Sequence, residues 1–169
     1  MVEQSLPKII AHSNKEVITM PIQTILVPTD FSELATEAVD FAFLMGEQMK
    51  LSMIFLYVDE WPDHSDPMAP LHNEYGIYKK NDASALLNDL VQRAKDRGLK
   101  GSKELVDGVP SVEIIRTAKK RKTDLIVIGT HGRTGVTHIM IGRQADQVIR
   151  ESPCPVVTVK STKHEYPSA

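Results

Sequence analysis

The chain has 169 residues, 41% of them hydrophobic, which suits one domain with a single buried core. Its formal net charge of −2 gives no electrostatic reason to expect nucleic acid as a partner. No apolar run approaches the roughly 20 residues of a membrane-spanning helix, and the N-terminus lacks a signal-peptide core. The one cysteine, Cys154, has no internal disulfide partner, which suits a reducing compartment. We expect a cytoplasmic protein that binds neither nucleic acid nor membrane.

The N-terminal half of the chain alternates strand and helix patterns. The β-branched run 24–27 predicts a short buried strand, and the apolar spacing over 35–49 predicts an amphipathic helix after it. Residues 52–58 predict a second buried strand. A second helix is expected over about 82–97, where Gly98 ends it. Its apolar face comprises Leu86, Leu87, Leu90, Val91 and Ala94.

The C-terminal half continues the alternation. Residues 102–106 predict a weaker, more exposed strand, and Pro110 opens a third helix with Val112, Ile115 and Ala118 inward. The apolar run 125–128 predicts another buried strand. A fourth helix is expected over 139–150, and 156–159 form the last strand. The inward residues of that helix are Ala145, Val148 and Ile149.

Alternating strands and helices with continuously apolar strands predict an α/β fold, in which a parallel sheet is covered on both faces. Such folds bind ligands at the carboxyl ends of the strands, where the strand order reverses. Residues 21–161 make up this domain. Residues 1–20 are expected to be a mobile extension, 59–80 a long loop, and 162–169 a short tail.

A glycine motif follows the strand at 125–128. It reads Gly129-x2-Gly132-x9-Gly142, and Gly135 lies within it. Glycines between a strand and a helix let backbone N–H groups approach an anion closely, because no Cβ intervenes. The spacing therefore favours a phosphate-binding role for these glycines over a role that is limited to permitting turns.

Three segments resemble universal stress proteins: 25–32, which reads ILVPTDFS, 129–135, which reads GTHGRTG, and 152–157, which reads SPCPVV. They occur in the family's order and at its separations. The resemblance implies a Rossmann-like three-layer sandwich with a five-stranded parallel sheet of order 3-2-1-4-5. It also implies a homodimer joined through the last strand, 155–160, and a class of members that binds ATP.

The resemblance also implies a nucleotide site. Pro28, Thr29 and Asp30 would line the ribose and phosphates, and Val58 would face adenine. The glycine loop, together with the start of the helix that follows it, would hold the phosphates. The residues implied there are Gly129, Thr130, His131, Gly132, Arg133, Gly135, Gly142, Arg143 and Gln144. ATP, ADP or AMP is the expected ligand, with Mg²⁺ a candidate companion ion. No catalytic residue and no metal ligand is assigned.

Two site residues have alternative interpretations. The family's ATP-binding pattern has Ser or Thr after the last glycine, where this chain has Arg143. Arg143 could grip a phosphate, fill the pocket, or turn outward to Asp146. Asp30 could instead be a helix N-cap, with Glu33 completing a capping box.

These observations predict an adenine-nucleotide-binding stress-response or regulatory protein that acts through a protein partner, with at most slow ATP hydrolysis. One alternative is a universal stress protein of the class that does not bind ATP. Another is a receiver-like signalling domain, which would need an acidic pair after the first strand, whereas Asp30 stands there alone.

Overall fold

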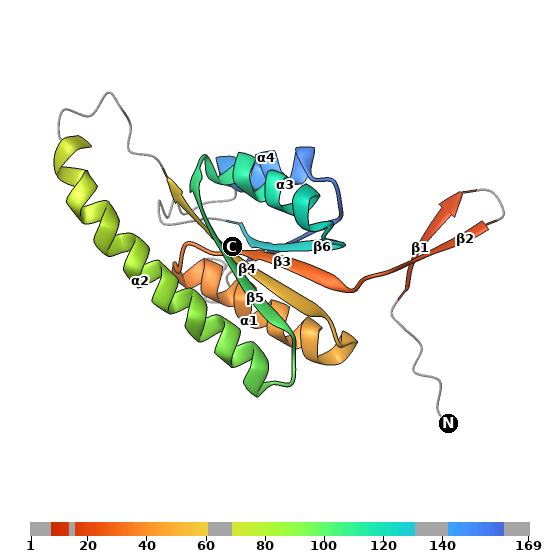
Figure 1. Ribbon diagram of the computed structural model, residues 1–169. Coiled ribbons are helices and arrows are strands. Elements are labelled where there is room, and N and C mark those ends of the chain that lie inside the picture. Colours follow the sequence, from red (N-terminus) through yellow and green to blue (C-terminus); the bar gives the residue numbers. More distant parts are fainter. Residues whose placement is uncertain (1–7, 14–15, 61–68, 131–141, 161–169) are drawn as a thin grey trace, which may run out of the picture.

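The computed structural model describes residues 8–13, 16–60, 69–130 and 142–160, with side chains described from residue 21 onward except in 61–80 and 131–141. A five-stranded sheet forms the centre of the domain (Figure 1). Its order is β5-β4-β3-β6-β7, and every neighbouring pair is parallel. Numbered within this sheet, the order is 3-2-1-4-5, which confirms the predicted topology. The strands are β3 (Thr24–Pro28), β4 (Ser52–Glu60), β5 (Gly101–Gly108), β6 (Leu125–Gly129) and β7 (Val156–Val159).

Two helices cover each face of the sheet (Figure 1). α1 (Glu33–Met49) and α2 (Ala69–Asp96) pack on one face, and α3 (Pro110–Arg121) and α4 (Arg143–Glu151) pack on the other. This arrangement follows from the central strands, whose successive side chains point to opposite faces. Met53 and Phe55 of β4 join the core under α1 and α2, whereas Ile54 joins the core under α3 and α4. The strands are apolar throughout because both faces are buried.

Two helices differ from their predicted bounds. α2 begins at Ala69, so residues 69–80 are helical where the sequence predicted a loop, and 59–60 belong to β4. The segment 69–80 carries no clear apolar stripe, so the sequence did not predict a helix there. In the structure it extends the strongly periodic helix that follows. α4 begins at Arg143 rather than at Ile139, with Gly142 as its N-cap. Residues 139–141 lie outside the described part of the chain.

Three predicted core residues are instead exposed. Leu86 is 46% exposed, Val112 40% and Ile149 39%. Each lies at the margin of its helix's apolar stripe, beyond the reach of the sheet. Their neighbours in the stripes, such as Leu87, Ile115 and Val148, are buried as predicted. A helix on a sheet buries only the stripe that faces the strands.

An antiparallel strand pair precedes the domain, which the sequence patterns did not predict. β1 (Lys8–Ser13) pairs with β2 (Glu16–Pro21) in a register that sets Ile9 opposite Met20. Figure 1 shows this ribbon projecting away from the five-stranded sheet. The two segments, KIIAHS and EVITMP, show neither the continuous apolar run of a buried strand nor the strict alternation of a half-buried one.

Candidate functional site

The strand order reverses between β3 and β6, so the carboxyl ends of these two strands mark the expected ligand site. Their pairing runs from Ile25↔Leu125 to Leu26↔Ile126, and both strands continue beyond it. Pro28 and Thr29 follow on one side, and Gly129 and Thr130 follow on the other. The structure therefore brings together the ends of two segments that are about a hundred positions apart in the sequence.

A series of hydrogen bonds shapes the turn from β3 into α1. The Thr29 N–H donates to the Leu56 carbonyl at 2.8 Å, and the Thr29 hydroxyl oxygen accepts from the Phe31 N–H at 3.0 Å. The Asp30 carboxylate accepts from the Ser32 N–H at 3.0 Å. The N-cap of α1 is Ser32, whose hydroxyl accepts from the Ala35 N–H at 3.3 Å. The interpretation of Asp30 as the N-cap was therefore wrong. The cap is Ser32, two residues later, and Asp30 stabilises the turn before it.

Phe31 stands in this turn with a left-handed backbone, at φ 61°. That conformation costs a non-glycine residue on the order of 1–2 kcal/mol. Its ring stacks on Tyr57 with centroids 5.5 Å apart and packs against the core under α1 and α2. The stacked ring holds the strained turn in place, and with it Asp30. This role could not be predicted from the residues, since nothing in a single Phe indicates a left-handed backbone.

The segment between β6 and α4 is closed at its base. The Thr130 N–H donates to the Val159 carbonyl at 3.1 Å, and the Gly142 N–H donates to the Thr130 carbonyl at 2.8 Å. Thr130 is buried. The two ends of the span 131–141 therefore meet at the carboxyl edge of the sheet. The predicted site residues His131, Gly132, Arg133 and Gly135 lie in that span, outside the described residues.

α4 begins at this closed base without a side-chain cap, since its N-cap is Gly142. The first N–H groups of a helix lack intrahelical partners and attract anions. Arg143, the first residue of α4, is exposed, and within the described residues it makes no ion pair. Asp146 pairs instead with Arg150, at 3.0 Å, so the outward pairing of Arg143 with Asp146 was wrong.

Gln144 and Gly129 have structural roles in addition to those predicted. The Gln144 side-chain oxygen accepts from the Ser111 N–H at 3.0 Å and so caps α3, whose own N-cap Val109 makes no side-chain bond. A Cβ on Gly129 would lie 3.0 Å from the Leu34 carbonyl oxygen, so this glycine lets the first turn of α1 approach β6. Val58 is half-buried opposite Val106, two residues before β4 ends.

Within the described residues, no group of three or more His, Cys, Asp or Glu side chains could hold a metal ion. None of the described helices combines the length and the apolar character needed to cross a membrane.

Comparison with known proteins now decides the family. Residues 21–160 match the profile of the universal stress protein family. Universal stress protein MJ0531 of Methanocaldococcus jannaschii is 34% identical over 142 residues, which cover 83% of this chain and 84% of the relative. The chain belongs to the universal stress protein family.

Solved structures of universal stress proteins share this fold. The structure of MJ0577, from the same organism, has a TM-score of 0.76 at 28% identity and covers 85% of this chain and 99% of that one. A universal stress protein solved in complex with cAMP has a TM-score of 0.61 at 26% identity and covers 81% and 96% of the two chains. The family match begins at residue 21, so the β1–β2 ribbon precedes the universal stress protein domain.

Proposed function

We propose that this universal stress protein binds an adenine nucleotide at the carboxyl edge of its sheet. The observation that carries the proposal is the closed loop base at the strand-order reversal. There the Gly142 N–H donates to the Thr130 carbonyl, and α4 begins without a side-chain cap. A helix start of this kind favours a phosphate group. The related universal stress protein in complex with cAMP, an adenine nucleotide, supports the same ligand class.

Different groups of residues would contact different parts of the nucleotide. The glycine loop 129–142 and the first N–H groups of α4 hold the phosphates. Thr29 and Asp30, fixed by the turn after β3, face the ribose and phosphates, and Val58 offers an apolar contact to adenine. Arg143 extends from the first turn of α4, where its guanidinium can reach a terminal phosphate. Gln144 contributes by fixing α4 against α3 rather than by contacting the ligand.

The nucleotide acts as a regulatory ligand rather than as a substrate that is rapidly consumed. None of the described residues is placed to orient a water molecule for attack on a phosphate, so hydrolysis is slow at most. Nucleotide binding changes a surface that a protein partner in the cytoplasm recognises. The protein acts as a homodimer joined through β7.

The direct test is to identify the nucleotide that the protein carries. Protein purified without added nucleotide is denatured, and the released small molecules are identified by mass spectrometry. Calorimetric titration with ATP, ADP, AMP and cAMP, each with and without Mg²⁺, then ranks the ligands. We expect ATP to bind. Failure of all four to bind nucleotide-free protein would contradict the proposal and place the chain with the family members that do not use ATP.

A loop variant tests where the nucleotide binds. Gly132→Val puts a branched side chain where phosphate meets backbone, so we expect ATP affinity to fall sharply while the far-ultraviolet circular dichroism spectrum is unchanged. Unchanged ATP titration by the folded variant would remove the glycine loop from the proposal.

A further inference from the structure

The sheet has a second open edge, at β5, and the amino half of this edge lies at the opposite end of the parallel strands from the proposed nucleotide site. β5 pairs with β4 on one side and is the terminal strand on the other. The Met53 N–H donates to the Lys100 carbonyl at 2.8 Å, so the even-numbered residues of this segment direct their backbone groups toward β4. The backbone groups of Gly101, Lys103 and Leu105 therefore face outward, along a strand twice as long as β7.

The two faces of β5 meet different helices. Ser102 and Glu104 lie on the face covered by α3, where Arg121 contacts their oxygens at 3.4 and 2.6 Å. Lys103 lies on the face covered by α2, where its ammonium contacts the Ser84 hydroxyl at 2.9 Å. A strand added to the open edge would therefore place alternate side chains beside Arg121 and beside Lys103.

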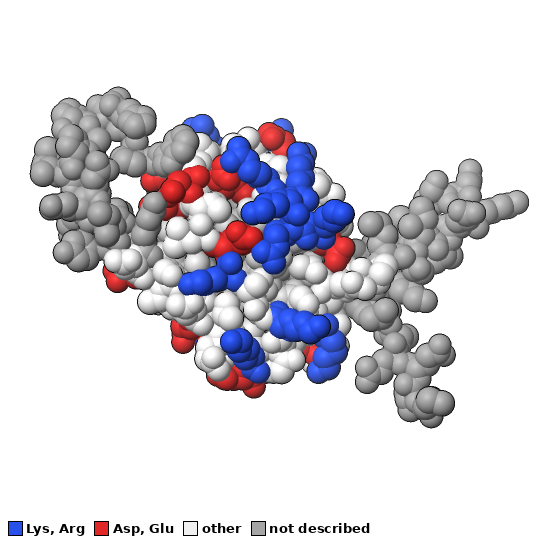
Figure 2. Space-filling view, in the orientation of Figure 1, with Lys and Arg blue, Asp and Glu red and all other residues white. Residues whose placement is uncertain are grey.

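Lys and Arg side chains are concentrated near the amino half of this edge. Figure 2 shows Lys and Arg side chains gathered over the C-terminal end of α3, with others along β5. We define this basic surface as Lys100, Lys103, Lys119, Lys120, Arg121 and Lys122. Glu104 pairs with Arg121, and the Asp124 carboxylate accepts from the N–H groups of Gln23 and Thr24. Within the described residues, the lysines of the basic surface make no ion pair, so most of its charge is uncompensated.

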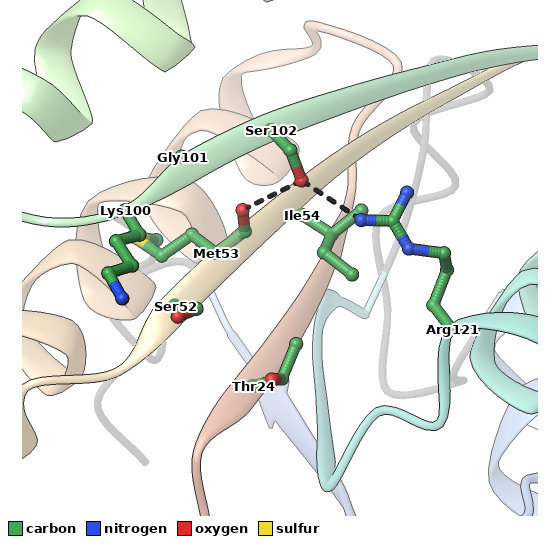
Figure 3. Close-up of a pocket in the computed structure, with 8 residues that line it drawn as sticks. All are labelled: Thr24, Ser52, Met53, Ile54, Lys100, Gly101, Ser102 and Arg121. Atoms are coloured by element: carbon green, nitrogen blue, oxygen red, sulfur yellow. Dashed lines mark hydrogen bonds between the residues drawn. The ribbon is translucent and has the colours of Figure 1, made fainter.

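A small cavity lies at the amino end of this edge. It has a volume of about 200 Å³ and is lined by residues of β3, β4 and β5 together with Lys100 and Arg121. Figure 3 shows the Arg121 guanidinium beside Ser102, above the floor formed by Ile54 and Thr24. The bonds to Glu104 and Ser102 use two of the five N–H donors of a guanidinium. The others can serve a carboxylate that enters the cavity.

We propose that the open edge of β5 accepts an extended acidic segment of another protein as a sixth strand. Backbone hydrogen bonds to the outward-facing residues of β5 would give the segment its register, and its carboxylates would meet the basic surface on either side. Charge complementarity selects this occupant. A second copy of β5 would set like charges against each other, whereas the short edge at β7 carries no charged residue within Val156–Val159. The basic surface contains no aromatic side chain on which the bases of a nucleic acid could stack.

The test uses a fluorescently labelled peptide of four Glu-Thr repeats as the probe, with fluorescence anisotropy as the readout. We expect saturable binding that weakens as salt rises. The same peptide with its four central residues N-methylated keeps every charge but loses backbone donors, and should bind roughly tenfold more weakly. A Lys-Thr peptide should not bind. Equal binding by the N-methylated or the Lys-Thr peptide would overturn the proposal, and so would tighter binding of a single-stranded oligonucleotide of equal length.

A pair of charge reversals locates the site. Lys120→Glu should weaken the Glu-Thr peptide by roughly fivefold or more. Arg150→Glu makes the same change in charge on α4, which packs beside β6 and β7, and should leave the affinity unchanged. Equal effects of the two variants would overturn the proposal.

Hydrogen exchange provides a test at single residues. The peptide should slow amide exchange at Lys103 and Leu105, while Ser102, Glu104 and Val106 are already protected by β4. Protection elsewhere without protection of these two amides would also overturn the proposal. Because β4 and β3 separate β5 from β6, and the basic surface lies at the amino ends of the strands, both results are independent of nucleotide binding.

Discussion

Arg143 is the residue on which the proposed nucleotide binding most depends. It stands on the first turn of α4, exposed, where the family pattern has a hydroxyl residue. Because Asp146 is paired with Arg150, Arg143 is not drawn away from the loop by that carboxylate. Its guanidinium can therefore act on a bound phosphate from the start of the helix.

We predict that Arg143→Ala weakens ATP binding by about 1.5–3 kcal/mol, the usual range for charge-assisted hydrogen bonds. ATP binding by this variant should also depend less on salt. Isothermal titration calorimetry on wild type, Arg143→Ala and Arg143→Ser measures both effects. If wild type fails to bind while Arg143→Ser binds, Arg143 fills the phosphate pocket instead of gripping the phosphate.

Gly129 shows that a glycine in a binding motif can be required for packing. A Cβ there would lie 3.0 Å from the Leu34 carbonyl oxygen, and backbone cannot move aside cheaply. We predict that Gly129→Ala destabilises the fold by about 1–3 kcal/mol, measured by urea denaturation.

Gly98→Ala is the comparison for this variant. Gly98 has open space around its Cβ position and a φ of +71°, so alanine there should cost about 1 kcal/mol from backbone strain alone. A Gly129→Ala protein as stable as wild type would show that α1 is not held against β6 by this contact.

At the scale of elements, α3 and α4 stabilise each other through a cap that crosses between them. The Gln144 oxygen accepts from the Ser111 N–H at 3.0 Å, and the Gln147 oxygen accepts from the Ser111 hydroxyl at 2.7 Å. Ser111 is fully buried, so its N–H has no ready replacement partner in solvent. The position of α4, and with it the uncapped helix start at the site, thus depends on α3.

We predict that Gln144→Ala lowers the free energy of unfolding by about 1–2 kcal/mol. Gln92→Ala is the matched control, because it removes an exposed bond to Asp96 on α2 and should cost no more than about 0.5 kcal/mol. Equal stability of the two variants in chemical denaturation would mean that the cap contributes nothing. A large loss of ATP affinity with unchanged stability would instead make Gln144 a ligand contact.

At the scale of the whole molecule, the β7 edge favours self-association. β7 is a four-residue terminal strand, and Val157 and Val159 pack against the core under α1. Asp40 and Glu47 pair with Arg93 and Arg97 on α2. Phe41 and Leu44, which are 40% and 60% exposed, lie on the outer side of α1, and this helix contacts β7. An open edge beside exposed apolar side chains suits an isologous dimer.

We predict a dimer of about twice 18.8 kDa by light scattering. The Thr130 N–H donates to the Val159 carbonyl, so the backbone groups of Thr158 face away from β6. Thr158→Pro should therefore give a folded monomer, because it removes only an outward N–H. Thr158→Val keeps that N–H and should stay dimeric. A monomeric wild type would exclude the interface.

We expect the β1–β2 ribbon to be dispensable for the domain. The family match begins at residue 21, and the Asp124 carboxylate holds the N–H groups of Gln23 and Thr24 at the start of β3. We predict that deleting residues 1–20 leaves the midpoint of thermal unfolding and the ATP affinity unchanged within error. A clear fall in that midpoint would show that the ribbon packs on the domain.

The sequence patterns by themselves determined the alternating α/β fold with five strands, because buried parallel strands such as 125–128 are continuously apolar and the helices carry clear stripes. The order of those strands followed only from the resemblance to universal stress proteins. The sequence also identified the segments that meet at the strand-order reversal. It could not supply the strained Phe31 or the capping role of Gln144. Each of these depends on neighbours brought close only by folding, and residue spacing carries no information on such contacts.

The structure alone also decided how far the helices extend and which of their residues are buried. Leu86, Val112 and Ile149 satisfy the helical period yet remain exposed, because burial depends on where the sheet ends rather than on the period. The basic surface arises in the same way. The run 119–122 suits a helix C-terminus when considered alone, and it becomes a surface only where the fold sets it beside Lys100, Lys103 and the open edge of β5.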